Sequence, residues 1–187
     1  MNLNEVTWRP PTIETERLIL RGYEPSDAPA IYVYASDPEV TPFMAWNRSR
    51  NIEDVHTFLN EGVARLYAAE ELSYALTLRE APNFVIGGVG VIWRPRAHRV
   101  LELGYILTKL HWGNGYVPEA SLALMRFAFQ NTDVARIFAP IFAANSKSRR
   151  CAEKIGLKFE GVQRSAHEYR GQRWDEAFYA ILRGELA

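Results

Sequence analysis

The sequence predicts a single α/β (α+β) domain over residues 1–187, in which helices flank a mixed central sheet of about seven strands. Three strand-like runs follow one another between residues 73 and 108, which is typical of an antiparallel meander. Two later strand-like runs are each preceded by a helix-like run, as expected where helices connect strands across a sheet. A chain of 187 residues has the length of one domain with a substantial core.

The N-terminal segment is expected to contain a strand followed by a helix. Residues 17–23 form the expected strand, because leucines recur there at every second position. A helix is expected to open at Pro25 and to run to about Ser36, with Ser26 or Asp27 as its N-cap. The prolines that follow break the chain into a loop.

A second helix and the three-stranded meander come next. The helix is expected over residues 52–69, because apolar residues recur at three- and four-residue spacing. These residues are Ile52, Val55, Leu59, Val63 and Leu66. The expected strands are Ser73–Leu78, Val85–Trp93 and Val100–Thr108, with a turn at Ala81-Pro82-Asn83 between the first two.

The C-terminal half alternates helices and strands. Pro118–Gln130 is apolar on nearly all sides and is expected to be a helix packed against the sheet, with Pro118 in its first turn. Arg136–Ala143 is the next expected strand, and Ser146–Ile155 is an expected helix that ends at Gly156.

Two last strands are expected at Leu157–Val162 and Trp174–Leu182, around a turn at Arg170-Gly171-Gln172. The predicted order of elements is therefore β-α-α-β-β-β-α-β-α-β-β. A meander combined with two helical crossovers implies a sheet that is neither purely parallel nor purely antiparallel.

The composition is that of an ordinary globular protein. Hydrophobic residues make up 48% and the formal net charge is zero, so no nucleic-acid partner is indicated. Cys151 is the single cysteine, which fits a reducing compartment. No signal peptide is visible and the apolar runs are too short for a bilayer, so we expect a cytoplasmic protein without membrane contact.

The segment from Lys109 to Ala120 carries the strongest functional signal. Gly113 and Gly115 lie between a strand-like run and a strongly apolar helix. Such a loop leaves backbone N–H groups free at a helix N-terminus, where the helix dipole favours negative charge. Glycine also lets the backbone approach a ligand closely. The pattern favours a phosphate or diphosphate, although two glycines can also serve only to make a tight turn.

Two better-known phosphate loops do not fit this segment. A Walker-type loop ends in Lys-Ser/Thr, where this chain has Tyr116-Val117. A dinucleotide-binding fingerprint requires a third glycine, where this chain has Pro118. Both alternatives fail on spacing.

The order of elements and three motifs resemble the GNAT superfamily of acyl-CoA-dependent N-acyltransferases. Within it, the chain is most similar to the ribosomal-protein-alanine N-acetyltransferase (RimJ/RimL-type) group. The resemblance covers about residues 15–182, the core of the single domain. Its motifs are Glu14–Arg21, then Glu102–Leu107 with Trp112–Tyr116 and Glu119-Ala120, and then Asn145–Arg150 with Lys154–Leu157 and Glu160-Gly161. Leu110 departs from the Arg or Gln of many members.

The resemblance implies acetyl-CoA (coenzyme A) as the cofactor. Val100–Thr108 and Arg136–Ala143 would be two parallel strands that splay apart. The edge of Ile106, Leu107 and Thr108 would pair with the pantetheine amides, as an added strand does. The loop that follows would hold the diphosphate through Trp112, Gly113, Asn114, Gly115 and Tyr116.

Attack on a thioester requires a neutral amine. An α-amine has a pKa of about 8 and is about one-tenth neutral at pH 7, so a general base accelerates the reaction. Glu102 is the best candidate, because it lies on the strand beside the expected opening. An ordinary exposed carboxylate, or a base that acts through a chain of waters, remains an alternative. His111 ranks behind Glu102, because it lies on the phosphate loop.

Two residues of the helix that follows residue 143 are given roles by the resemblance. Ser148 would protonate or stabilise the departing thiolate, and Asn145 would bond the pantetheine arm. Both residues also fit simple helix capping. Tyr105 is expected to pack in the core, with the cleft as the alternative, and Cys151 is expected to be buried packing. Lys147, Arg149 and Arg150 are expected to form a solvated helix face, with contact to the 3′-phosphate of the cofactor as the alternative.

The expected function is transfer of an acetyl group from acetyl-CoA to a primary amine, with a protein N-terminus as one acceptor. Alternatives are a small-molecule acceptor such as a polyamine, an amino acid or an antibiotic, a non-catalytic acyl-CoA-binding module, and a nucleotide hydrolase. The aromatic loop Phe43–Arg50 has two expected roles of equal weight, as part of the acceptor wall or as an anchor of the loop on the core. A monomer or a homodimer is expected. No metal is expected, because the four histidines lack ligand spacing.

Overall fold

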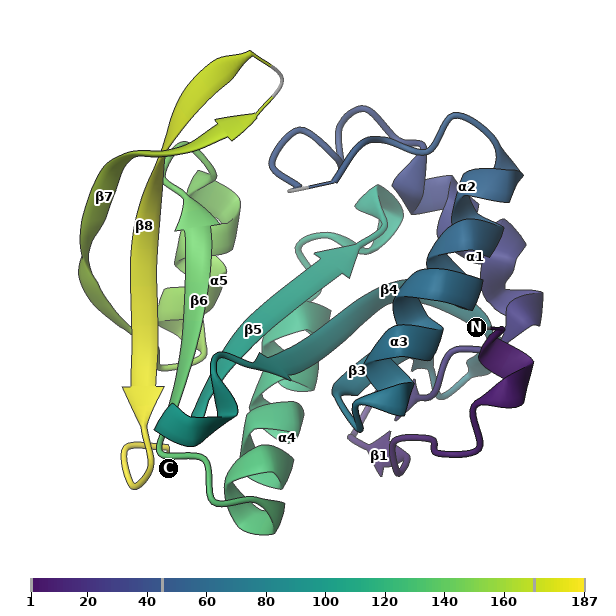
Figure 1. The fold of residues 1–187 in the computed structure, drawn as a ribbon, viewed down its shortest axis with the longest axis horizontal. Coiled ribbons are helices and arrows are strands. Elements are labelled where there is room, and N and C mark those ends of the chain that lie inside the picture. Colours follow the sequence, from purple (N-terminus) through teal and green to yellow (C-terminus); the bar gives the residue numbers. More distant parts are fainter. Residues whose placement is uncertain (1, 45, 170, 187) are drawn as a thin grey trace.

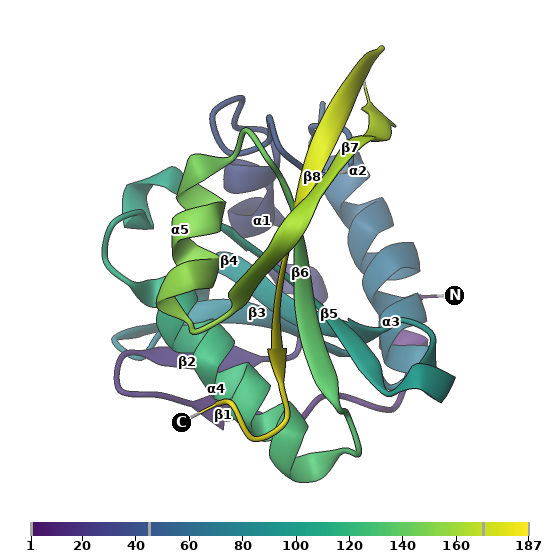
Figure 2. The same ribbon diagram turned by 90° about the vertical axis from the view of Figure 1, so that its left-hand side faces the viewer.

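A computed structural model describes residues 2–44, 46–169 and 171–186. Its sheet has eight strands in the order β1-β2-β3-β4-β5-β6-β8-β7 (Figures 1 and 2). The strands are β1 (Ile13–Glu14), β2 (Leu18–Arg21), β3 (Leu72–Leu78), β4 (Ala81–Trp93), β5 (Val100–Leu107), β6 (Arg136–Phe142), β7 (Lys158–Tyr169) and β8 (Gln172–Leu182). The helices are α1 (Ala28–Ala35), α2 (Ile52–Thr57), α3 (Ala64–Ala68), α4 (Tyr116–Asn131) and α5 (Ser146–Lys154).

The predicted mixed sheet flanked by helices is confirmed. All neighbouring strands pair antiparallel except β5 and β6, which are parallel. Each of the seven predicted strands is present, and β1 is an eighth. It spans only two residues, which is too short for an alternating pattern to reveal. The helix predicted over 52–69 is also present, with a π-helical stretch at Phe58–Val63 between α2 and α3.

One predicted turn is wrong by two residues. The chain reverses at Arg79 and Glu80, and Ala81 already pairs with Leu78. Pro82 therefore lies inside β4, where the pairing with β3 is irregular. A proline has no N–H for the ladder, so it is tolerated at such irregular positions.

The β7–β8 hairpin is longer than predicted. β7 continues to Tyr169, seven residues beyond the expected end at Val162. Most residues of β7 are exposed, so no alternation of apolar residues marks this part of the strand. Of the predicted turn, Arg170 lies outside the described residues, and Gln172 is the first residue of β8.

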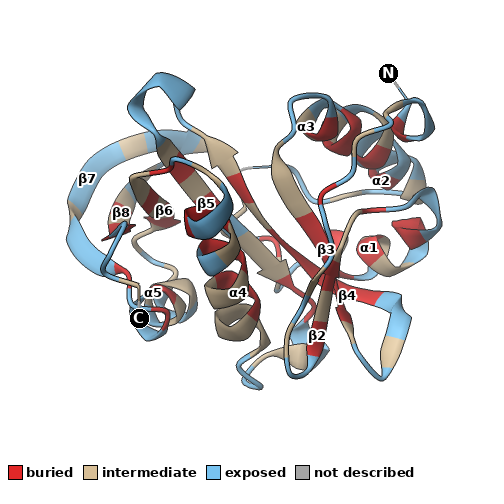
Figure 3. Cartoon of the chain, turned by 90° about the horizontal axis from the view of Figure 1, so that it is seen from below, coloured by how far each residue is buried: buried red, intermediate tan, exposed pale blue. Residues whose placement is uncertain are grey.

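The two faces of the sheet are covered by different helices. α4 contacts β2, β4 and β5, and α5 contacts β6, β7 and β8, whereas α1 contacts β4 and α3 contacts β3. Each helical layer closes its own apolar core, one centred on Leu124 and Ile137 and the other on Leu59 and Tyr67. Buried residues follow the strands and the sheet-facing sides of the helices (Figure 3).

The sheet divides after three parallel residue pairs. β5 and β6 pair only at Val100 with Arg136, Leu101 with Ile137, and Glu102 with Phe138. Beyond this point β5 stays with β4 and β6 stays with β8, so the two strands diverge (Figure 1). We call the region between residues 103–107 of β5 and 139–142 of β6 the fork. The predicted splayed parallel pair is present.

Within the described residues, the structure contains no helix with the length and apolar character needed to cross a membrane.

Candidate active site

The strand β5 turns alternate backbone groups toward the fork. Thr108 donates its N–H to the Ile86 carbonyl at 2.8 Å, and Arg94 donates to the Val100 carbonyl at 2.9 Å. In an antiparallel ladder these even-numbered positions of β5 therefore bond to β4, and the odd-numbered ones point to the other side. Leu107 and Tyr105 direct their N–H groups into the fork.

This geometry reduces the number of residues on the predicted cofactor-binding edge whose backbone groups can reach the cofactor. Of the three residues Ile106, Leu107 and Thr108, only Leu107 has its N–H on the fork side. Its carbonyl is already bonded to the indole Nε1 of Trp112 at 2.9 Å. Nearest the open end of the fork, the groups that a pantetheine amide would meet are the N–H groups of Leu107 and Tyr105 and the Tyr105 carbonyl.

The loop before α4 forms a cradle of free N–H groups. Gly113 and Gly115 have φ values of +83° and +79°, which side-chain-bearing residues rarely adopt. Within the described part of the chain, the N–H groups of residues 113–117 donate to no protein acceptor. They lie at the N-terminus of α4, where the helix dipole adds partial positive charge. The loop therefore has the geometry of an anion site.

Arg17 braces this loop from the start of the sheet, and its part was not predicted. Its guanidinium donates to the Asn114 carbonyl at 3.0 Å, lies over the Tyr116 ring, and pairs with Glu119 at 2.6 Å. Glu119 also accepts the Thr15 hydroxyl at 2.6 Å. Burial alone would raise the pKa of Glu119, but the hydrogen bonds from Thr15 and Arg17 outweigh burial and lower it. The predicted signature around Thr15 thus has a structural role.

We expect Arg17→Met to weaken coenzyme A binding about tenfold, because the loop loses its brace and a nearby positive charge. Isothermal titration of coenzyme A into the variant measures this loss. Arg79→Met is the matched control, since it removes an ion pair with Glu14 and a hydrogen bond to the Thr15 carbonyl on the same segment without contacting the loop. Equal losses in both variants would contradict a specific role for Arg17.

Basic residues of α5 make one further contact with the loop. Lys147 is exposed, as expected for a solvated helix face, and its Nζ also lies 4.2 Å from the centroid of the Trp112 ring on the loop. Arg149 departs from that expectation, because it is half-buried and donates to the Tyr179 hydroxyl at 2.9 Å. Leu110 is 86% exposed, which shows that this side chain makes little contact with the protein.

Tyr105 and Ser148 meet beside the fork. Their hydroxyl oxygens lie 2.9 Å apart, and the Tyr105 hydroxyl also lies 3.1 Å from the Ser148 carbonyl. Tyr105 packs against the core as expected, and burial raises the pKa of its hydroxyl. Asn145 is the N-cap of α5 and accepts the Ser148 N–H at 3.1 Å, which confirms the capping expectation. The amide nitrogen of Asn145 is not used in that bond.

Cys151 lies on α5 close to Tyr105. Burial raises the pKa of its thiol, which keeps it protonated and poorly nucleophilic. This placement agrees with the expected packing role.

Glu102 stands where the fork begins. It is the last residue of β5 that pairs with β6, and its carboxylate accepts the Arg94 guanidinium at 2.8 Å. The side chain keeps 27% of its surface exposed, so solvent reaches it. Its neighbours Leu101 and Leu103 are buried in the core under α4, so Glu102 faces the opposite side of the sheet, toward α1–α3. His111 belongs to the loop before α4 and not to the Glu102 end of the fork, because its ring contacts the Tyr116 ring.

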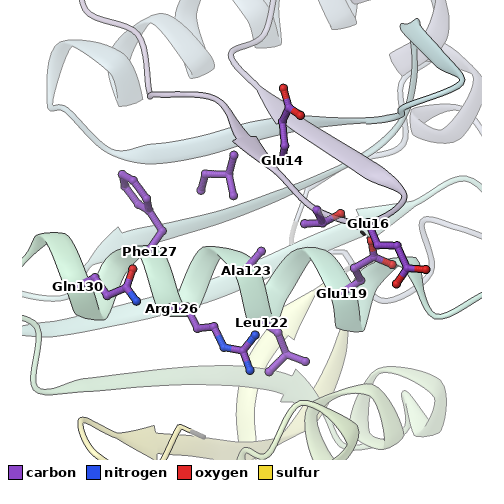
Figure 4. Close-up of a pocket in the computed structure, with 10 residues that line it drawn as sticks. Glu14, Glu16, Glu119, Leu122, Ala123, Arg126, Phe127 and Gln130 are labelled. Atoms are coloured by element: carbon purple, nitrogen blue, oxygen red, sulfur yellow. Dashed lines mark hydrogen bonds between the residues drawn. The ribbon is translucent and has the colours of Figure 1, made fainter.

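A separate hollow lies between the β1–β2 turn and α4 (Figure 4). Glu14, Glu16 and Glu119 are among its lining residues, and Phe127 lies toward its other end. Carboxylates oppose a diphosphate, and Thr15 and Glu119 line this hollow while the loop and fork residues that would hold the cofactor do not. We therefore do not place the cofactor there. Among the described residues, no three His, Cys, Asp or Glu side chains gather in a group able to hold a metal ion.

A fork between parallel strands, beside an anion cradle at a helix N-terminus, is the arrangement that the resemblance implies for an acyl-CoA-dependent N-acyltransferase. Residues 17–158 match the acetyltransferase (GNAT) domain family. The chain is 30% identical to the uncharacterized N-acetyltransferase YoaA of Bacillus subtilis (strain 168), over 92% of this chain and 97% of that protein. The chain belongs to the GNAT acetyltransferase family.

Solved structures agree with this assignment. A GNAT-family acetyltransferase from Bacillus anthracis superposes with a TM-score of 0.81 at 28% identity, covering 92% of this chain and 99% of the other. RimL, a ribosomal L7/L12 α-N-protein acetyltransferase solved with coenzyme A, shares the fold with a TM-score of 0.80 at 19% identity, covering 92% and 98% of the two chains. The protein is an acetyl-CoA-dependent N-acetyltransferase, and acetyl-CoA is the co-substrate of its family.

Proposed function

We propose that this enzyme transfers the acetyl group of acetyl-CoA to the α-amine at the N-terminus of a peptide or protein, by direct attack in a ternary complex. The observation that carries the proposal is that these groups meet at the fork from both faces of the sheet. The free N–H groups of residues 113–117 lead to those of Leu107 and Tyr105 in the fork, where the Tyr105–Ser148 hydroxyl pair lies on the α5 side and Glu102 on the opposite side.

Different residues of the site have different proposed roles. The loop N–H groups and Arg17 would hold the diphosphate, and the N–H groups of Leu107 and Tyr105 would orient the pantetheine arm as an added strand. Asn145 has its amide nitrogen available for the same arm. These contacts would fix the thioester near the hydroxyl pair of Tyr105 and Ser148.

The transfer itself needs two proton movements. The amine nitrogen forms a bond to the acetyl carbonyl carbon, and the carbon–sulfur bond breaks. Glu102, directly or through water, accepts the proton that the amine loses. The hydroxyl of Ser148, which is bonded to that of Tyr105, would donate a proton to the departing thiolate and be reprotonated from solvent. The products are the N-acetylated amine and coenzyme A as a thiol.

Direct attack is preferred to an acyl-enzyme because the single cysteine of the sequence is a poor nucleophile. Cys151 is half-buried, and burial raises the pKa of its thiol. A covalent route would need a lowered thiol pKa and a neighbouring base.

Initial-rate kinetics test the proposal. Thiol release is measured while acetyl-CoA and an alanine-initiated peptide amide are varied together, and intersecting lines are expected for a ternary complex. Cys151→Ala should leave the pattern and the rate unchanged, whereas Ser148→Ala should lower kcat. A panel containing spermidine, free amino acids and an aminoglycoside runs in parallel. Parallel lines, or turnover confined to the small molecules, would refute the proposed acceptor or route.

A further inference from the structure

One face of the β6–β8 half-sheet carries a carboxylate that has no part in the steps above. Glu176 on β8 is the register partner of Phe142 on β6, so both side chains point to the same face. The alternate residues Ala177 and Tyr179 are buried in the core, and Tyr179 bonds to residues of α5. Glu176 therefore points away from α5, to the side of the sheet that carries the loop between α1 and α2.

Glu176 is held in place by a histidine from β7. The Nε2 of His167 lies 2.9 Å from a carboxylate oxygen of Glu176, with 12% of the glutamate side chain and 51% of the histidine side chain exposed. The contact depends on an irregularity in the hairpin. β7 contains extra residues between Gln163 and His167, which brings His167 opposite Trp174. Such bulges often re-aim a side chain near a functional site.

The bulge is fixed by hydrogen bonds. Ser165 has a φ of +55°, and its N–H donates to the Asp175 carboxylate at 2.8 Å. Arg173 donates to both the hydroxyl and the carbonyl of Ser165, at 2.5 and 2.6 Å. The position of His167 over Glu176 is therefore built into the hairpin.

Aromatic rings flank this carboxylate and join the hairpin to the loop between α1 and α2. The Phe142 ring contacts those of His167, Trp174 and Phe43, with centroids 6.1, 5.6 and 6.3 Å apart. Tyr169 donates its hydroxyl to the Trp46 carbonyl. Figure 1 shows the loop facing the tip of the hairpin above the diverging strands. The expectation that the loop around Phe43 helps to form an acceptor wall gains support from these contacts.

We propose that Glu176, flanked by Phe142 and Trp174, binds a positively charged side chain a few residues after the reacting amine, so the preferred acceptor is a peptide with a cationic N-terminal segment. Carboxylates and aromatic faces both attract cations. Glu176 lies four residues along β6 from the level of Glu102, since Phe142 follows Phe138 by that number. This is about 13 Å, the length of about four extended residues. The inference rests on the proposed function.

Matched peptides test the proposal by the charge of their fourth residue. The probes are Ala-Ala-Phe-Lys amide and Ala-Ala-Phe-Glu amide, which share the reacting amine and the aromatic residue. For the native enzyme we expect kcat/KM for thiol release to be about tenfold higher with the lysine peptide. Glu176→Gln should bring the two values to within about twofold. Glu168→Gln, the same change on the opposite face of β7, should leave the ratio unchanged.

A measurement on the native enzyme guards against misfolding of the variant. The ratio between the two peptides should shrink as sodium chloride is raised, because salt screens the charge of Glu176. Rapid but equal turnover of both peptides, or a ratio that Glu176→Gln leaves intact, would overturn this inference and leave the proposed function standing. No thiol release with either peptide, while coenzyme A still raises the melting temperature, would overturn the proposed acceptor and this inference with it.

Discussion

Gly113→Glu is expected to raise the Kd for coenzyme A more than about 100-fold. The new carboxylate would lie about 5 Å from the diphosphate charges, and each such pair costs about 3 kcal/mol at an effective dielectric constant of 20. The space for the side chain exists, because no atom lies within 4 Å of the position that a Cβ would take. The loss therefore comes from charge in the cradle and not from a steric clash. Isothermal titration with coenzyme A measures it.

Gly184→Glu is the matched control. Gly184 has a φ of +94° and open space at its Cβ position, as Gly113 has, but it lies in the turn after β8. Both variants therefore carry the backbone strain of a side-chain-bearing residue at positive φ, about 1–2 kcal/mol. Unchanged affinity in Gly113→Glu would remove the diphosphate from this loop.

Glu102→Gln should lower kcat/KM about 100-fold at pH 7 while leaving the affinity for coenzyme A unchanged. The substitution keeps the size of the side chain but cannot accept a proton, and a general base typically contributes a factor of this size. The difference from the native enzyme should narrow toward pH 9, because a peptide α-amine with a pKa of about 8 is then mostly neutral. Rates of thiol release over this pH range give the comparison.

Arg94→Gln separates the base from its ion pair. It breaks the same 2.8 Å contact but leaves the Glu102 carboxylate in place, so we expect less than about a fivefold loss. Similar losses in both variants would assign the effect to the ion pair. A Glu102→Gln enzyme with nearly native activity at pH 7 would exclude this carboxylate as the base.

Local patterns were sufficient for most of the fold. Apolar periodicity and glycine or proline punctuation predicted seven strands and the helices around them, because these signals are written in neighbouring residues. The position of the turn at Arg79 and the length of β7 were predicted wrongly, because neither is determined by neighbouring residues. Pairing with a partner strand determines both, and β7 is mostly exposed, so its residues carry no apolar pattern.

The candidate site was also predicted only in part from the sequence. The two glycines of the loop mark a backbone conformation and were visible in the sequence. The contact of Arg17 with Glu119 joins residues 102 positions apart, and the contact of Tyr105 with Ser148 spans 43 positions. The His167–Glu176 pair depends on a bulge that no composition rule predicts. Contacts between distant elements depend on the folded structure and leave no local pattern in the sequence.

The brace from Arg17 to the loop before α4 has a practical consequence for protein engineering. A shortened version that begins after this arginine would retain most of the sheet and most of both apolar cores, yet the loop that we propose to hold the diphosphate would be left without support. Purification tags and fusion partners are therefore better attached so that the segment up to Arg17 stays intact, and trimming should be judged by affinity for the cofactor as well as by solubility.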